Sequence, residues 1–131
     1  MALRVSAADL VAEARARVPE VGTAEAIAQH GDPDLVIVDI RDVRELKREG
    51  TVPGALHAPR GMLEFWVDPE SPYHREVFAT GKTFIFFCAA GWRSALATKT
   101  VQDMGLTPVK HIEGGFGAWR EAGLPIDLPE K

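Results

Sequence analysis

The residue best suited to chemistry in this chain is its single cysteine, Cys88, which ends an apolar run that begins at Thr83. A lone cysteine forms neither an internal disulfide nor a cysteine-rich metal site, so Cys88 is either an inert core residue or a reactive thiol. The next residues favour a reactive thiol, because two alanines and a glycine let a loop curl tightly and turn its N–H groups inward. Such N–H groups bind an anion, which here would be the thiolate.

A predicted helix follows this loop directly and adds to the effect. Its pattern runs from Ser94 to Met104, Gly105 ends it, and the N-terminal end of a helix favours negative charge. Arg93 adds a permanent cation if its side chain turns toward the loop. We therefore take Cys88 as the candidate nucleophile, and the candidate cradle for its charged sulfur comprises Ala89, Ala90, Gly91, Trp92, Arg93 and Ser94.

Buried strands and helices alternate along the chain and would place this loop at the edge of a sheet. Apolar runs predict strands over 35–39, 83–88 and 109–112, with a brief extended piece over 52–56. Helical patterns cover 24–29, 41–48 and 94–104, with weaker ones over 60–67, 72–79 and 119–122. This alternation predicts an α/β fold with a parallel sheet covered on both faces, and ligand sites lie at the carboxyl ends of such strands.

Composition bounds the classes of protein that the chain can represent. Its 131 residues predict one domain, and 15 basic against 19 acidic residues give a net charge of −4, so we expect no nucleic-acid partner. The longest apolar run, 84–90, is too short to cross a bilayer, so no membrane association is expected. The first residues show no secretory signal pattern, which makes the cytoplasm the expected location.

The N-terminal residues 1–22 are expected to be a helical extension that precedes the domain at 23–131. Ser6 and Asp9 fit a capping box for a helix that runs to about Arg17. The predicted apolar face of this helix comprises Leu10, Val11 and Ala14. Thr23 is expected to cap the next helix, which ends at Gln29.

Four motifs in the same order resemble the rhodanese-like domain family over about 23–125. They are Val38-Asp-Ile-Arg41, Val52-Pro-Gly-Ala55, the loop 88–94, and Glu113-Gly-Gly-Phe-Gly-Ala-Trp119 with Gly123-Leu-Pro125. The resemblance implies a single rhodanese-like domain, with about five mostly parallel central strands flanked by helices on both faces.

The same resemblance implies a sulfurtransferase. Cys88 would take a sulfane sulfur from thiosulfate or a persulfide donor and pass it to cyanide or a thiol through a persulfide, with no cofactor and no metal. Three alternatives stay open. They are a persulfide relay that docks a protein donor or acceptor, a cysteine-dependent phosphatase, and a non-catalytic binding module.

Departures from the family pattern bear on these alternatives. Four residues separate Cys88 from Arg93, whereas cysteine-dependent phosphatases use five to wrap a phosphate. Ala89 and Ala90 replace charged residues of some thiosulfate-preferring loops, which makes thiosulfate a weaker expected donor. Thr51 stands where the family often has histidine, and we interpret this as a tolerated change away from the chemistry.

Three further residues are candidates for a supporting role. Asp39 and Arg41 would orient the loop or form an ion pair that closes a strand end, and the ion pair is the favoured interpretation. Arg60 would assist an anionic donor or stay a solvated surface charge. The histidines lack metal-ligand spacing, so we expect them to be surface or core groups, and they comprise His30, His57, His74 and His111.

Overall fold

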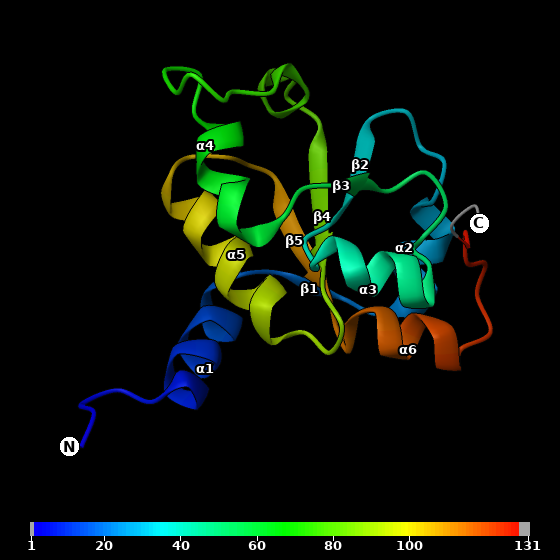
Figure 1. Cartoon of the computed structure of the whole chain (residues 1–131), viewed down its shortest axis with the longest axis horizontal. Helices are drawn as coiled ribbons and strands as arrows, with labels where there is room; N and C mark the ends of the chain where they lie inside the picture. The colour runs from blue at the N-terminus through cyan, green and yellow to red at the C-terminus, as the bar shows by residue number, and fades with distance from the viewer. Residues whose placement is uncertain (1, 129–131) are drawn as a thin grey trace.

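Five parallel strands form the central sheet in residues 2–128, which the computed structural model describes (Figure 1). Their order across the sheet is β1-β5-β4-β2-β3. The strands are β1 (Glu20–Val21), β2 (Leu35–Asp39), β3 (Leu56–His57), β4 (Thr83–Phe87) and β5 (Val109–Ile112). This architecture confirms the predicted α/β fold with a parallel sheet.

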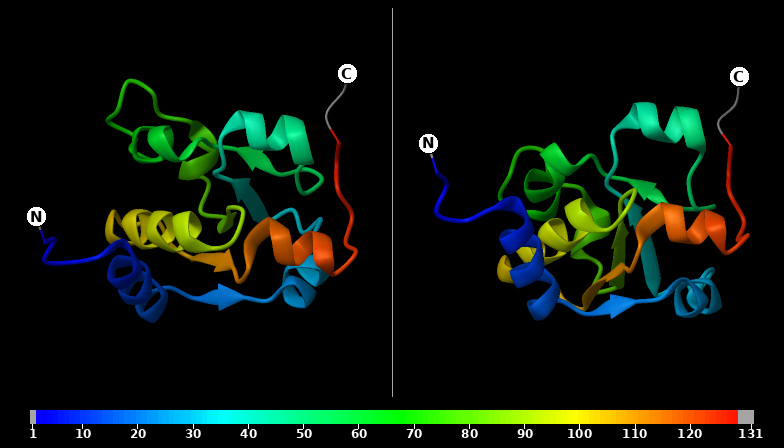
Figure 2. Two further views of the ribbon diagram at one scale, coloured as in Figure 1. Left: turned by 60° about the horizontal axis from the view of Figure 1, so that its bottom comes forward. Right: turned by 90° about the horizontal axis from the view of Figure 1, so that it is seen from below.

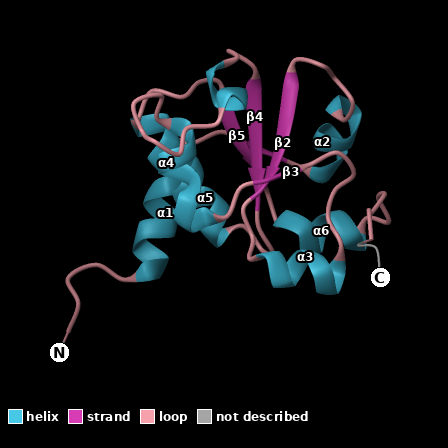
Figure 3. Cartoon of the chain, turned by 45° about the horizontal axis from the view of Figure 1, so that its top comes forward, coloured by secondary structure: helices cyan, strands magenta, loops and turns pink. Residues whose placement is uncertain are grey.

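Helices alternate with the strands and cover both faces of the sheet (Figures 1 and 3). They are α1 (Ala7–Arg17), α2 (Thr23–Gln29), α3 (Val43–Glu49), α4 (Leu63–Val67), α5 (Trp92–Asp103) and α6 (Gly115–Glu121), with 3₁₀ turns at Arg60–Met62 and Glu76–Ala79. The helical segment expected over 60–67 is present as a 3₁₀ turn that continues into α4, whereas the one expected over 72–79 is reduced to the 3₁₀ turn at its end. None of the helices in the described residues is long and apolar enough to span a membrane.

Strand β4 is buried on both faces, which explains its continuous apolar run. Phe84 and Phe86 belong to one core cluster, with side chains from α4 and α5. Ile85 and Phe87 belong to the opposite cluster, with side chains from α2 and α6. Successive side chains of a strand point to opposite faces, so one short segment joins both halves of the core.

Several element boundaries differ from those predicted. Helix α5 begins at Trp92 rather than Ser94, and Gly91 precedes it in the left-handed region with φ of +107°. Helix α6 begins at Gly115 rather than near Trp119, because Gly114 also takes a left-handed conformation there. The prediction that Thr23 caps the second helix is wrong, since Gly22 holds the cap position without a side-chain hydrogen bond.

The N-terminal segment contains more than the predicted helix. The capping box of Ser6 and Asp9 is confirmed, and Val11 and Ala14 pack on α5. Leu10 was expected on the same face but is exposed, because the contact with α5 involves the smaller side chains. Residues Glu20–Val21 then form β1, an edge strand paired with β5 (Figure 2).

Helix α6 holds the Cys88 loop, residues 88–94, by direct backbone contact. The N–H groups of Phe116 and Gly117 donate to the carbonyl oxygens of Cys88 and Ala89 at 2.8 and 3.0 Å. Gly115 has a φ of +59°, and a Cβ at that position would overlap the carbonyl oxygen of Cys88. The glycines of the C-terminal motif therefore permit this approach, and Trp119 of the same motif is completely buried.

We predict that Gly115→Ala lowers the free energy of unfolding by about 3–4 kcal/mol, through backbone strain plus the overlap with the loop. Gly123→Ala is the matched control, because Gly123 also has a positive φ of +72° but meets nothing within 4 Å. Its expected cost is only about 1–2 kcal/mol, the strain alone. Urea unfolding measures both values, and equal losses would contradict a close contact at Gly115.

Candidate active site

Cys88 lies at the carboxyl edge of the sheet, directly after β4. Asp39, the last residue of β2, is in register with Phe87, so the ends of the two central strands meet at this edge. The thiol is almost completely buried, with 1% of the residue exposed. Its position matches the place where parallel α/β sheets bind ligands.

Backbone N–H groups surround the sulfur of Cys88. Gly91 donates to Sγ at 3.1 Å and Ser94 at 3.3 Å, while Sγ lies 3.5 Å from the Ser94 hydroxyl. The left-handed conformation of Gly91 turns the loop back over Cys88 and makes this arrangement possible. Donors aimed at sulfur stabilise a thiolate more than a neutral thiol, so the geometry suits a nucleophile.

The six cradle residues divide into groups with different surroundings. Gly91 and Ser94 hold the sulfur, whereas Ala90 and Trp92 are exposed at the surface. Trp92, the first residue of α5, is 55% exposed and presents an apolar side chain at the end of the loop. Ala89 is half-buried, and its carbonyl oxygen accepts the hydrogen bond from α6.

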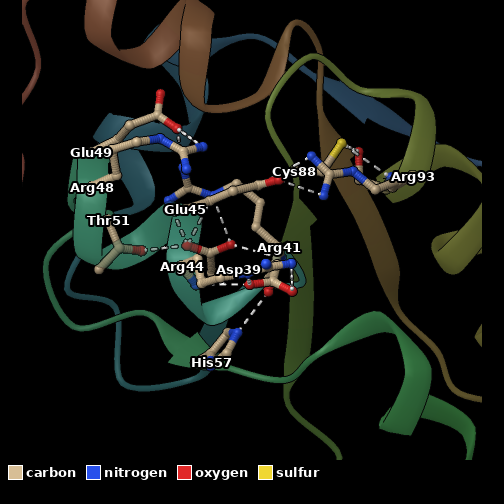
Figure 4. A network of polar contacts seen from close by, with 12 residues as sticks. Asp39, Arg41, Arg44, Glu45, Arg48, Glu49, Thr51, His57, Cys88 and Arg93 are labelled. Carbon is tan, nitrogen blue, oxygen red and sulfur yellow. Dashed lines mark hydrogen bonds and ion pairs between the residues drawn. The ribbon is translucent and has the colours of Figure 1, made fainter.

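Arg93 is bound by an acidic residue that the sequence did not single out. Its guanidinium group donates to both carboxylate oxygens of Glu45 on α3, at 3.0 and 3.2 Å (Figure 4). Burial alone would lower the pKa of Arg93, but the hydrogen bond and charge of Glu45, with a smaller contribution from Cys88, raise it above its usual value. Arg93 is thus a cation beside the loop whose charge Glu45 balances.

Asp39 and Arg41 form the ion pair that was predicted at the end of β2, and both are completely buried. Nη2 of Arg41 lies 2.8 Å from the Asp39 carboxylate and 2.7 Å from the carbonyl oxygen of Gly50. The guanidinium group also stacks 4.3 Å from the ring centre of Phe116. The pair therefore joins β2, the end of α3 and α6, which is a structural role.

The same network reaches the Cys88 loop through α3 (Figure 4). Nε of Arg41 lies 4.0 Å from a carboxylate oxygen of Glu45, and Nη1 lies 3.9 Å from a carboxylate oxygen of Glu49. Thr51 donates its hydroxyl to Asp39 at 2.7 Å, so this departure from the family pattern belongs to the polar network at the strand end. Glu45 contacts both Arg41 and Arg93 and connects the buried pair to the loop.

Arg60 takes part in a different interaction. Its guanidinium group donates to Glu64, one turn further along the chain, at 2.7 Å. Within residues 2–128, no hydrogen bond or ion pair joins Arg60 to the Cys88 loop. The arrangement brings Asp39 and Arg41 into the network of the site but leaves Arg60 in a local surface pair.

A second polar contact of the loop was also missed. The Ser94 hydroxyl lies 3.1 Å from Nδ1 of His111, and both residues are buried. The strand pattern carried a signal, because His111 shares a face with Val109 in a buried strand. Residues 2–128 contain no group of three or more His, Cys, Asp or Glu side chains placed to hold a metal ion.

Comparison with known proteins assigns the chain to a family. The family model described as "Rhodanese-like domain" matches residues 23–122. The chain belongs to the rhodanese-like domain family. A sulfurtransferase from Allochromatium vinosum is 33% identical to this rhodanese-like domain over 97 residues, which cover 74% of this chain and 82% of the relative.

Solved structures agree with this assignment. A protein of unknown function from Rhodopseudomonas palustris, described as a possible tyrosine phosphatase, is 54% identical with a TM-score of 0.94, and the match covers 97% of this chain and 98% of that one. The polysulfide-sulfur transferase homodimer of Wolinella succinogenes is 31% identical with a TM-score of 0.69, over 92% of this chain and 85% of that one. The chain therefore shares its fold with proteins of known structure, one of which is described as a polysulfide-sulfur transferase.

We predict that Arg41→Met lowers the free energy of unfolding by about 3–5 kcal/mol, because it leaves the Asp39 carboxylate buried without its partner. Arg60→Met makes the same change in a pair where Arg60 is 32% and Glu64 39% exposed, and we expect it to cost less than about 1 kcal/mol. Urea unfolding of both variants measures the difference. A small cost for Arg41→Met would contradict the structural role of the buried pair.

Proposed function

We propose that this rhodanese-like domain transfers a sulfane sulfur from thiosulfate or a persulfide donor to cyanide or a thiol, through a persulfide on Cys88. The observation that supports the proposal is the pair of N–H groups, from Gly91 and Ser94, aimed at a buried Sγ. The same loop would hold the terminal sulfur of a persulfide, which is also an anion.

The reaction has two covalent steps. The Cys88 thiolate attacks the outer sulfur of thiosulfate, a new S–S bond forms, the old one breaks, and sulfite leaves with its electron pair. A nucleophile such as cyanide then attacks the terminal sulfur, and the Cys88 thiolate leaves unchanged. The backbone donors stabilise negative charge in both steps, so the chemistry requires no metal or organic cofactor.

We predict that the purified protein gains the mass of one sulfur atom after thiosulfate treatment and loses it after cyanide. Cys88→Ser should gain nothing, because the serine hydroxyl does not form the persulfide. Intact-mass spectrometry measures both. A gain that survives in Cys88→Ser, or no gain with thiosulfate and polysulfide alike, would contradict the proposal.

Phosphatase activity is the alternative suggested by the description of the Rhodopseudomonas palustris protein. Against it stand the four residues between Cys88 and Arg93 and the engagement of Arg93 by Glu45. Hydrolysis of an aryl phosphate that depends on Cys88, without any gain of sulfur, would favour a phosphatase. A Cys88→Ser protein with full biological activity would favour a binding module.

A relay that takes sulfur from a protein persulfide, with little thiosulfate activity, is a second candidate supported by the loop. Glu45 offsets the charge of Arg93, and Ala89 and Ala90 add no charge, so a small dianion meets little attraction. The exposed ring of Trp92 beside the loop offers an apolar contact instead. A desulfurase-type donor would then load Cys88 faster than thiosulfate does.

We predict that Glu45→Gln raises kcat/KM for thiosulfate several-fold, equivalent to about 1 kcal/mol, by freeing the charge of Arg93. Glu49→Gln is the matched control, because it makes the same charge change on α3 next to Arg41 but does not contact Arg93. Steady-state thiocyanate formation measures both variants. Equal increases would show an effect of net charge and not of the Glu45–Arg93 pair.

A further inference from the structure

A row of polar groups extends from Cys88 toward the β1 edge of the sheet, buried at Ser94 and His111 and partly exposed at Glu20. The Ser94 hydroxyl lies 3.5 Å from Sγ of Cys88 and 3.1 Å from Nδ1 of His111. On the far side of the imidazole, Nε2 lies 3.7 Å from the carboxylate of Glu20. We call these three residues the Ser94–His111–Glu20 row.

Three different elements hold the row in place. Ser94 lies in the first turn of α5, His111 in β5 and Glu20 in β1, and Glu20 is the register partner of His111. Arg15 on α1 fixes the Glu20 carboxylate through two hydrogen bonds, at 2.7 and 3.3 Å. The row therefore rests on backbone register and on an ion pair.

Packing alone does not explain an imidazole at position 111. His111 is 1% exposed, and its Nε2 has no hydrogen-bond partner among the described residues. An aliphatic side chain would fill this place without burying an unpaired polar atom. Nδ1 of His111 lies within hydrogen-bond distance of the Ser94 hydroxyl, which also contacts the candidate nucleophile.

The tautomer of His111 sets the direction of the hydrogen bonds in the thiol form. If His111 carries its proton on Nε2, facing Glu20, then Nδ1 accepts from the Ser94 hydroxyl. The oxygen of that hydroxyl is then free to accept the Cys88 S–H. This arrangement leads from the thiol to a basic nitrogen through one hydroxyl group.

We propose that His111 takes up the proton of Cys88 through the Ser94 hydroxyl and so generates the thiolate. The S–H bond breaks as an O–H bond forms at Ser94, and the original Ser94 proton moves to Nδ1. The products are a thiolate, an unchanged hydroxyl that now donates to Sγ, and an imidazolium facing Glu20. The proposal rests on the proposed function only in taking Cys88 as the nucleophile, and His111 is a positioning residue because it acts through Ser94.

The charges around His111 are compatible with this role. Burial lowers the pKa of His111, and so does the charge of Arg15, whereas Glu20 and Glu113 raise it. The net lowering keeps the imidazole neutral near pH 7, which leaves it able to accept a proton. The hydrogen bonds from Arg15 lower the pKa of Glu20, so its carboxylate is ionised when an imidazolium forms beside it.

Alkylation by iodoacetamide tests the proposal, because its rate follows the thiolate and needs no sulfur donor. In His111→Gln we expect the rising limb of the rate–pH profile to move about one unit toward higher pH, which slows alkylation about tenfold on that limb. Ser94→Ala should shift the limb at least as far, and adding His111→Gln in that background should change nothing. A purely structural role would lower stability without moving the profile.

The matched control is Thr98→Val, one turn further along α5. Thr98 is completely buried, and its hydroxyl has no partner among the described residues. The alkylation rate–pH profile of Thr98→Val should therefore coincide with that of the unaltered protein. An equal shift in Thr98→Val would overturn the proposal, as would a His111→Gln effect that persists in Ser94→Ala. The variants could show the expected shifts in the alkylation profile while the unaltered protein gains no sulfur from thiosulfate or polysulfide. That result would overturn the proposed function and leave the role of His111 standing.

A measurement on the unaltered protein covers the case in which a variant fails to fold. Nitrogen-15 NMR distinguishes the two neutral imidazole tautomers. Near pH 7 we expect His111 to be neutral with its proton on Nε2. A neutral His111 with its proton on Nδ1 would overturn the proposal, because Nδ1 could then not accept from Ser94.

Discussion

A loop that turns its N–H groups inward toward a sulfur leaves its carbonyl groups facing away, and buried carbonyl groups need donors of their own. In this domain the first turn of α6 supplies them, to Cys88 and to Ala89. The contact is close enough that only glycine fits at position 115. The N–H cradle therefore depends on the C-terminal glycine motif, which supplies donors to the carbonyl groups of the loop, although the two segments lie far apart in the sequence.

Electrostatic contacts hold α3 in place, whereas apolar packing holds the other helices. Helix α3 has no buried residue, yet Glu45 and Glu49 both face the buried guanidinium group of Arg41. Arg41 in turn is fixed by Asp39 and by the aromatic face of Phe116. The place of Glu45 beside Arg93 is thus set by a charge inside the protein and not by a hydrophobic surface.

The sequence was sufficient where a local pattern carries the information. The run before Cys88 predicted β4, the small residues after it predicted a tight loop, and the spacing of Asp39 and Arg41 predicted their ion pair. Strand β1 was not predicted, because a strand of two residues is too short to show an alternating hydrophobic pattern.

Contacts between distant segments were missed for a different reason. A helix of alternating charge resembles a solvated surface element, so the ion pair of Glu45 with Arg93 was not predicted. The contact of Ser94 with His111 joins a helix to a strand and has no local signature. Both depend on the strand order of the sheet, which places β2 on one side of β4 and β5 on the other.

Strand β1 has one further consequence. It lies at the end of the sheet, it pairs with β5, and α1 packs on α5 next to it. If the segment before residue 23 were removed, β5 would present unpaired N–H and C=O groups, and a bare strand edge recruits other chains into intermolecular sheets. The short N-terminal segment therefore covers a strand edge that the following residues would otherwise leave open.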